Sequence, residues 1–231
     1  MALNKSNGNM YTWITHTWNT VKGECPHGCT YCYMKRFGKQ KPVRFDESEL
    51  KTDLNGDHFF GCNSRNFIFF GSSCDMFAND IPFEWIKQTI DHCQKHYRNG
   101  YLFQSKNPAR IMSFIPYMPS RSFICTTIES NRFYPEIMMN SPKPSERAGW
   151  LKKLKEHFDV FVTIEPVLDF DLEEMIALIK HCEPKQVNIG ADSGNNNLPE
   201  PSKEKLLALI DELKKFTVID QKRNLNRILN S

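Results

Sequence analysis

Short apolar runs alternate with amphipathic helical segments along most of this 231-residue chain. The runs have the length and the β-branched or aromatic content of strands. The segments between them repeat apolar residues three or four positions apart, as a helix with one buried face does. We expect strands at residues 11–18, 66–70, 101–105, 122–128, 160–164 and 186–190. We expect helices at 33–41 and 82–97, from 108, and at 145–158, 172–181 and 202–215.

Strand–helix units in series favour a parallel sheet with right-handed crossovers. Eight units close a full barrel of about 250 residues. Six units in 231 residues therefore predict an α/β fold, a partial (β/α)6 TIM-like barrel that is open on one side. We expect a single domain over residues 1–231 with its core at about 11–216. Residues 42–65 are predicted to be a surface excursion, and 217–231 a C-terminal tail holding either a last strand or a last helix.

Three cysteines occur close together in Cys25-Pro-His-Gly-Cys29-Thr-Tyr-Cys32, directly after the first predicted strand. One short loop with three thiols offers three ligands and no obvious fourth. Structural zinc sites close a tetrahedron with four ligands, and a cubane iron–sulfur cluster also normally takes four thiolates. Three thiolates on a cubane leave one iron open, and an open iron can bind a substrate or a cofactor.

The other cysteines are scattered, and buried free thiols are the ordinary interpretation of Cys93, Cys125 and Cys182. Cys62 and Cys74 remain alternative ligands or reactive thiols. His27, inside the cysteine loop, is expected to face solvent, with ligation as the alternative.

Polar residues gather where each predicted strand ends. They are Ser72, Ser73 and Asp75, then Gln104 and Lys106, then Glu129, Ser130 and Asn131, then Glu165, and last Asp192 and Ser193. Ligands of parallel α/β folds bind at the carboxyl ends of the strands. The alternative for any single residue is a solvent contact or a helix cap. All six ends converging on the edge that carries the cysteines favours a site.

The C-x3-C-x2-C spacing, with Tyr31 just before the last cysteine, resembles the radical S-adenosylmethionine superfamily. The resemblance implies that Cys25, Cys29 and Cys32 hold a [4Fe-4S] cluster whose open iron binds S-adenosyl-L-methionine. Reductive cleavage of that cofactor would give a 5′-deoxyadenosyl radical.

The same resemblance implies contacts to the cofactor at three further strand ends. Ser72, Ser73 or Asp75 stands where the superfamily often has Gly-Gly-Glu. Glu129 or Ser130 would meet the ribose, and the stretch from Asn188 to Asp192 the adenosine.

Four phrases are similar to a phage-associated radical S-adenosylmethionine family that has been linked to spore photoproduct lyase. They are Trp18-Asn19, Gly28-Cys29-x-x-Cys32-Tyr33, Thr163-Ile-Glu-Pro166 and Asn188-Ile-Gly-Ala-Asp192. Some members are assigned to hypermodification of thymidine in phage DNA. This implies a nucleobase or DNA substrate, and an electron donor such as flavodoxin or ferredoxin. Basic residues beside the cysteine loop (Lys35, Arg36, Lys39, Lys41 and Arg44) either contact phosphate or form a solvated face.

The leading hypothesis is therefore an isomerase or lyase of this superfamily acting on a modified pyrimidine in DNA, with Glu165 and Lys106 as catalytic candidates. A photoproduct repair lyase, with Cys125 or Cys182 as hydrogen donor, is one alternative. A non-catalytic zinc module binding nucleic acid is another. The net charge of +3 permits a polyanionic partner. With no long apolar run and no apolar N-terminal segment, we expect no membrane span and a cytoplasmic location, in a bacterial host or a phage-infected cell.

Overall fold

The computed structural model describes residues 3–6, 11–55 and 65–230. The strands are β1 (Asn4–Lys5), β2 (His16–Thr17), β3 (Val21–Lys22), β4 (Arg44–Phe45), β5 (Phe67–Phe70), β6 (Gly100–Gln104), β7 (Ser122–Thr127), β8 (Asp159–Ile164), β9 (Gln186–Ile189) and β10 (Val218–Gln221). The α-helices are α1 (Phe83–Lys95), α2 (Pro108–Ile111), α3 (Pro135–Met138), α4 (Pro144–Leu154), α5 (Leu172–Cys182), α6 (Lys203–Leu213) and α7 (Asn226–Leu229). Short 3-10 helices are η1 (Tyr33–Phe37), η2 (Glu47–Lys51), η3 (Met112–Tyr117) and η4 (Arg223–Leu225).

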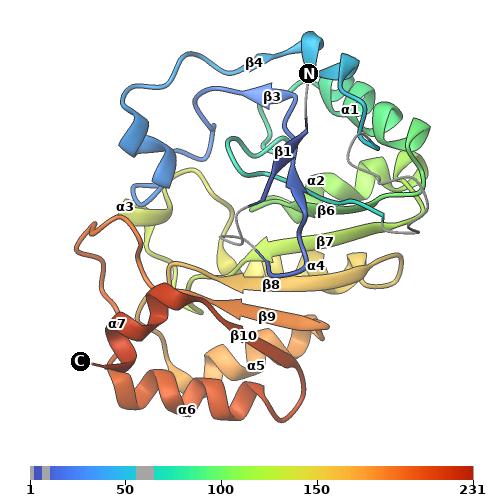
Figure 1. The fold of residues 1–231 in the computed structure, drawn as a ribbon. Coiled ribbons are helices and arrows are strands. Elements are labelled where there is room, and N and C mark those ends of the chain that lie inside the picture. Colours follow the sequence, from blue (N-terminus) through green and yellow to red (C-terminus); the bar gives the residue numbers. More distant parts are fainter. Residues whose placement is uncertain (1–2, 7–10, 56–64, 231) are drawn as a thin grey trace.

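One eight-stranded sheet, in the order β1-β2-β5-β6-β7-β8-β9-β10, forms the centre of the molecule (Figure 1). Neighbours from β2 to β10 run parallel, whereas β1 pairs antiparallel with β2 at the edge. Because β1 and β10 are opposite ends of this order, the sheet is open. The predicted α/β fold with an open, mostly parallel sheet is confirmed. The tail contributes both a further parallel strand, β10, and a last short helix, α7.

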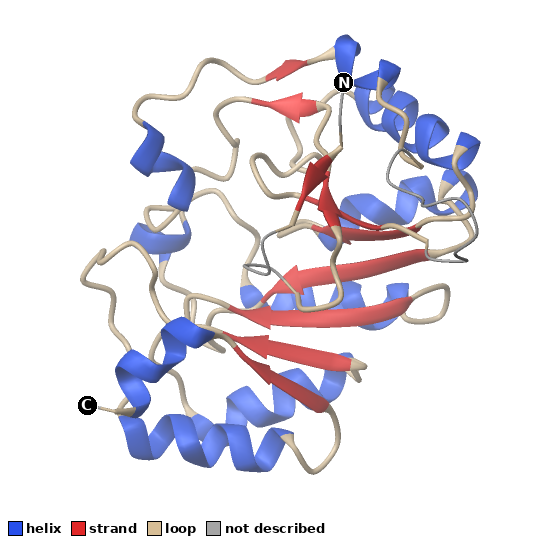
Figure 2. Cartoon of the chain, viewed as in Figure 1, coloured by secondary structure: helices blue, strands red, loops and turns tan. Residues whose placement is uncertain are grey.

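The two faces of the sheet differ in what covers them (Figure 2). Helices pack on one face, where Phe70, Phe103 and Ile124 join the main core. The opposite face carries a second apolar cluster that includes Phe69, Leu102 and Phe161. Strand register continues this inner face toward the carboxyl ends, where the side chains become polar. Thr127, Thr163 and Asn188 lie in one row, and Glu129 and Glu165 follow two residues further along their own segments.

Two predicted elements are shorter than expected. The first strand is reduced to β2, because Ile14 N bonds to Tyr11 O at 3.0 Å and turns the chain. The helix expected at 33–41 is only η1, which buries none of its residues and ends at Gly38 with φ 78°. An exposed segment gains no packing to extend a helix. No helix within the described residues has the length and apolar character needed to span a bilayer.

Candidate active site

The cysteine loop lies at the carboxyl end of the sheet, between β3 and η1. Its turns are closed by Gly28 N on Cys25 O (3.1 Å) and Cys32 N on Cys29 O (3.3 Å). Gly28 has φ 67°, a left-handed conformation that glycine adopts without strain. Cys29 is buried, whereas Cys25 and Cys32 are partly exposed. The loop therefore presents three thiols from one compact turn.

Two of the three thiols are poised to ionise. A hydrogen bond from the Cys74 thiol lowers the pKa of Cys25 to about 6. Burial opposes ionisation of Cys29, but Lys106 Nζ and Ser141 Oγ, each 3.2 Å from its sulfur, lower its pKa. Burial raises the pKa of Cys32. Because iron and zinc bind the thiolate, the environment of Cys25 and Cys29 suits metal ligation.

A buried ionic cluster adjoins Cys29. Lys106 Nζ lies 3.2 Å from Glu129 Oε1 and donates to the Tyr31 hydroxyl, which itself donates to Glu129. Arg147 Nη1 contacts the other carboxylate oxygen of Glu129 at 2.7 Å. Burial disfavours the Glu129 anion, yet Arg147 and Lys106 hold its pKa at about 2. The structure thus brings together three predicted residues, Tyr31, Lys106 and Glu129, and adds Arg147.

Asp75 connects three segments around the loop. Its Oδ2 accepts from His27 Nε2 (2.8 Å), Ser105 Oγ (2.9 Å) and the backbone N–H of Lys106 (2.8 Å). Its Oδ1 accepts from Phe77 N at 2.9 Å. With this set of donors, Asp75 fixes the cysteine loop against the ends of β5 and β6. His27 is buried, so the expectation that it faces solvent is wrong.

Three other predicted contacts are engaged within the chain. Ser72 Oγ accepts from Asn19 Nδ2 at 2.6 Å. Ser130 Oγ donates to the backbone oxygen of Asp169 at 2.7 Å. Asp192 accepts from Gly194 N at 2.9 Å and so closes its own loop. These three side chains therefore shape the loops at the strand ends, and their contact with a cofactor stays a prediction.

Some buried polar atoms at or near the carboxyl ends of the strands have no hydrogen-bond partner. Among the residues that the structure describes, Ser73 Oγ, Asn188 Nδ2 and Asn224 Oδ1 are buried without a hydrogen-bond partner. Asn188 is fully buried, and its Oδ1 accepts from Gln186 Nε2 at 2.7 Å, which leaves the Nδ2 group of the same side chain unpaired. Buried polar atoms are rarely left unpaired in folded proteins. The proposed cofactor, with its amine, carboxylate and ribose groups, could pair with such atoms where it reaches them.

Glu165 belongs to a separate cluster. It pairs with Lys222, and its Oε1 accepts from Asn224 Nδ2 at 3.1 Å. The two catalytic candidates, Lys106 and Glu165, therefore have different partners. Lys222 and Asn224 come from the C-terminal tail, where no motif identified them. Arg147 lies within a helix, where a periodic pattern cannot separate a buried cation from an exposed one.

Cys125 and Cys182 lie on opposite sides of the sheet. Cys125 is on the inner face, with its sulfur 2.8 Å from the Tyr11 hydroxyl, and burial raises its pKa to about 11. Cys182 packs in the core under the helices. Of the two predicted hydrogen donors, only Cys125 is placed on the face that carries the polar rows.

No group of three or more His, Cys, Asp or Glu among residues 3–6, 11–55 and 65–230 is arranged to hold a single metal ion. A [4Fe-4S] cluster differs, because each thiolate binds its own iron. Of the alternative zinc ligands, His27 bonds to Asp75 and Cys74 donates to Cys25, while Cys62 lies outside the described residues.

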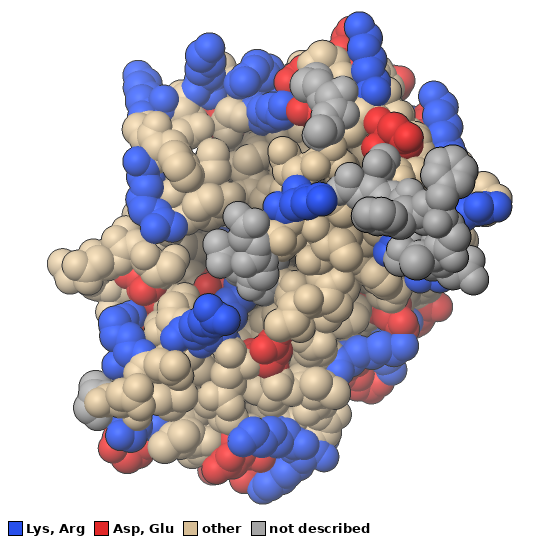
Figure 3. Space-filling view, viewed as in Figure 1, with Lys and Arg blue, Asp and Glu red and all other residues tan. Residues whose placement is uncertain are grey.

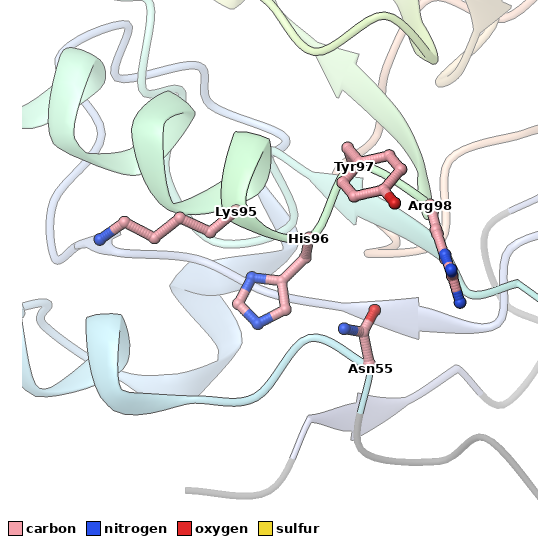
Figure 4. Close-up of a pocket in the computed structure, with 5 residues that line it drawn as sticks. All are labelled: Asn55, Lys95, His96, Tyr97 and Arg98. Carbon is pink, nitrogen blue, oxygen red and sulfur yellow. The ribbon is translucent and has the colours of Figure 1, made fainter.

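A shallow pocket of about 190 Å³ lies elsewhere, lined by Asn55, Lys95, His96, Tyr97 and Arg98 (Figure 4). Lys95 is the last residue of α1, and His96, Tyr97 and Arg98 connect it to the amino end of β6, while Asn55 comes from the segment before β5. The cysteine loop lies at the carboxyl end, where parallel α/β folds bind ligands. The pocket is therefore not part of the candidate active site.

Solved structures of spore photoproduct lyase share this fold. One mutant aligns with 96% of this chain and 79% of its own, with a TM-score of 0.69 and 10% identity. Another was solved with bound AdoMet and dinucleoside spore photoproduct. It aligns with 90% of this chain and 63% of its own, with a TM-score of 0.59 and 10% identity.

No curated protein matches the sequence. A family model described as "Protein of unknown function (DUF5131)" matches residues 9–203, most of the chain. The chain therefore belongs to the DUF5131 family of proteins of unknown function.

Proposed function

We propose that this protein is a radical S-adenosylmethionine enzyme. The observation that carries the proposal is the C-x3-C-x2-C loop at the carboxyl end of an open parallel sheet. The fold likeness to a lyase solved with bound AdoMet supports it. Cys25, Cys29 and Cys32 would hold a [4Fe-4S] cluster. With S-adenosyl-L-methionine bound, the cluster and this cofactor together would supply a 5′-deoxyadenosyl radical. A reductant such as flavodoxin or ferredoxin is part of the proposal.

The protein's own contribution is to orient the cofactor and to exclude water. Ser73 and Asn188 offer unpaired polar atoms to it, while Tyr31 and Glu129 form one wall with Lys106. Ser72, Asp75, Ser130 and Asp192 keep the loops around it in place. Lys106 keeps its proton, because Cys29, Tyr31 and Glu129 outweigh burial and raise its pKa. It is therefore a fixed cation beside Cys29.

A pyrimidine base in DNA is the proposed substrate. The support is the dinucleoside ligand of one structurally similar lyase and the resemblance to the phage-associated family. Glu165 and Lys222, which form an ion pair separate from the Lys106 cluster, would also face the substrate. Isomerase chemistry on a modified thymidine is the leading form of this proposal.

A photoproduct repair lyase is the second candidate, and the position of Cys125 favours it. A hydrogen donor needs to lie on the inner face, where Cys125 contacts Tyr11 and Thr163. DNA carrying a hypermodified thymidine and ultraviolet-irradiated DNA, offered separately to the same enzyme, distinguish the two candidates by which one is converted.

Anaerobic reconstitution tests the main proposal. The wild-type protein should bind iron and sulfide and, with dithionite and S-adenosyl-L-methionine, release 5′-deoxyadenosine. Cys29→Ala should abolish that release, whereas Cys93→Ala, which removes a buried thiol in α1, should retain it. Wild-type rates from Cys29→Ala would refute the proposal. One bound zinc and no iron or sulfide would favour the zinc-module hypothesis instead.

A further inference from the structure

The segment from Tyr33 to Arg44 directly follows the last cysteine, and we call it the basic rim. It contains five Lys or Arg residues and no Asp or Glu. The rim is fixed to the site, because the Tyr33 hydroxyl donates to the backbone oxygen of Ser72. Lys35 Nζ also donates to Gly28 O at 3.2 Å. Whatever binds the rim therefore lies beside the cysteine loop.

The cations of the basic rim are exposed. Within the described part of the chain, no carboxylate pairs with Arg36, Lys39, Lys41 or Arg44. In and just after the helices α4, α5 and α6, by contrast, Lys152 and Lys155 share Glu183, and Lys214 and Lys215 pair with Asp211 and Glu212. Figure 3 shows Lys and Arg along the edge of the molecule where η1 and β4 lie. Unpaired cations concentrated in one segment favour a polyanionic ligand.

An exposed aromatic side chain accompanies this charge. Phe37, at the end of η1, is 72% exposed, and its ring centroid lies 6.4 Å from that of Tyr33. Gln40 Nε2 donates to Met34 O and Gly38 O, at 3.1 and 3.0 Å, and fixes the turn behind it. A large apolar ring presented by a braced turn among cations is suited to stacking on a base.

We infer that the basic rim binds a single-stranded segment of DNA next to the active site. Arg36, Lys39, Lys41 and Arg44 contact its phosphates, and Phe37 stacks on an unpaired base. In a duplex both faces of each base are covered by its neighbours, so Phe37 gains a partner only where the strand is open. An enzyme that acts on a base must take that base out of the stack, which opens the strand at the same place. The inference rests on the proposed function for its choice of DNA.

Fluorescence anisotropy with a labelled 15-nucleotide oligo-dT tests the inference on reconstituted protein without reductant, across a range of salt. The triple variant Arg36→Ala/Lys39→Ala/Lys41→Ala should bind about 100-fold more weakly at 0.1 M salt. The negative slope of log K against log salt should become shallower by about 2, since each phosphate contact on a single strand contributes about −0.7 to it. Phe37→Ala should lose about ten-fold affinity with its slope unchanged.

The matched control is Lys180→Ala/Lys203→Ala/Lys214→Ala, which removes one charge from α5, one from the start of α6 and one just after its end. It should bind as the wild type does. Equal affinity of the rim triple variant and the wild type would overturn the inference. So would duplex DNA binding as tightly as oligo-dT, or tighter binding to RNA of equal length or to anionic lipid vesicles. Because binding is measured without reductant, its failure is distinct from a failure to release 5′-deoxyadenosine.

Discussion

The buried pair of Arg147 and Glu129 allows a quantitative test of how the site is held together. Neither side chain is exposed, and their contact is 2.7 Å long. Arg147 also donates to Thr127 O at 2.6 Å and to Pro142 O at 2.7 Å. Arg147→Met keeps much of the apolar volume but removes the charge and all of these donors.

The expected loss follows from the partners that Glu129 keeps. Removing one member of a buried ion pair costs about 3–5 kcal/mol, because the other charge is left buried. Lys106 Nζ, 3.2 Å from Glu129 Oε1, still compensates part of that charge. We therefore expect Arg147→Met to lower the free energy of unfolding by about 3 kcal/mol, near the lower end of that range.

Urea denaturation of the metal-free protein provides the measurement. Arg132→Met is the matched control, since its partners Asp169 and Asp171 are partly exposed and the cost should stay within about 1 kcal/mol. The double variant Arg147→Met/Glu129→Gln should lose less than the sum of the two single variants, because no uncompensated carboxylate remains. A loss below about 1 kcal/mol for Arg147→Met, or simple additivity, would refute the reasoning.

Two further predictions concern stability. A Cβ at Gly190 would lie 2.7 Å from Glu165 Oε1, so Gly190→Ala should cost about 1–3 kcal/mol. Gly149→Ala, in α4 with nothing within 4 Å, should instead stabilise by about 0.5–1 kcal/mol, and thermal unfolding compares the two. Burial raises the pKa of Cys182 from 9.0 to about 12. The stability that the buried, protonated thiol contributes is therefore complete below pH 9 and is lost as the pH rises toward 12. Cys182→Ala should flatten the fall in stability between about pH 9.5 and 10.5 by about 1 kcal/mol per pH unit, and an unchanged slope would count against this account.

The alternation of strands and helices was sufficient to predict the sheet, because each element contains enough residues to show its period. The same reasoning was inaccurate for short elements. Residues 11–18 have strand composition, but the turn at Tyr11 leaves only β2. Leu54, inside the predicted surface excursion, is fully buried, which a polar neighbourhood conceals.

Residues of the candidate site could be proposed from the sequence where they share a short motif or stand at the end of a predicted strand. Cys25, Cys29 and Cys32 are recognised by spacing alone, and Lys106 and Glu129 by their place at strand ends. Arg147 and Lys222 could not be found in this way, because each reaches its carboxylate partner from a distant segment. Such pairings depend on which distant elements the tertiary structure places in contact, and no local sequence pattern shows that.

The hydrogen bonds around Asp75 have a consequence for how the proposed cluster would be taken up and replaced. They join the cysteine loop to the sheet through His27, with protein groups alone. The backbone bonds from Asn140 N to His27 O (3.1 Å) and from Thr30 N to Ile137 O (3.0 Å) add further anchors. Zinc fingers, in contrast, fold only when the metal binds. We expect the proposed cluster to enter an already folded chain, so that protein which loses it to oxygen keeps its shape and can be reloaded.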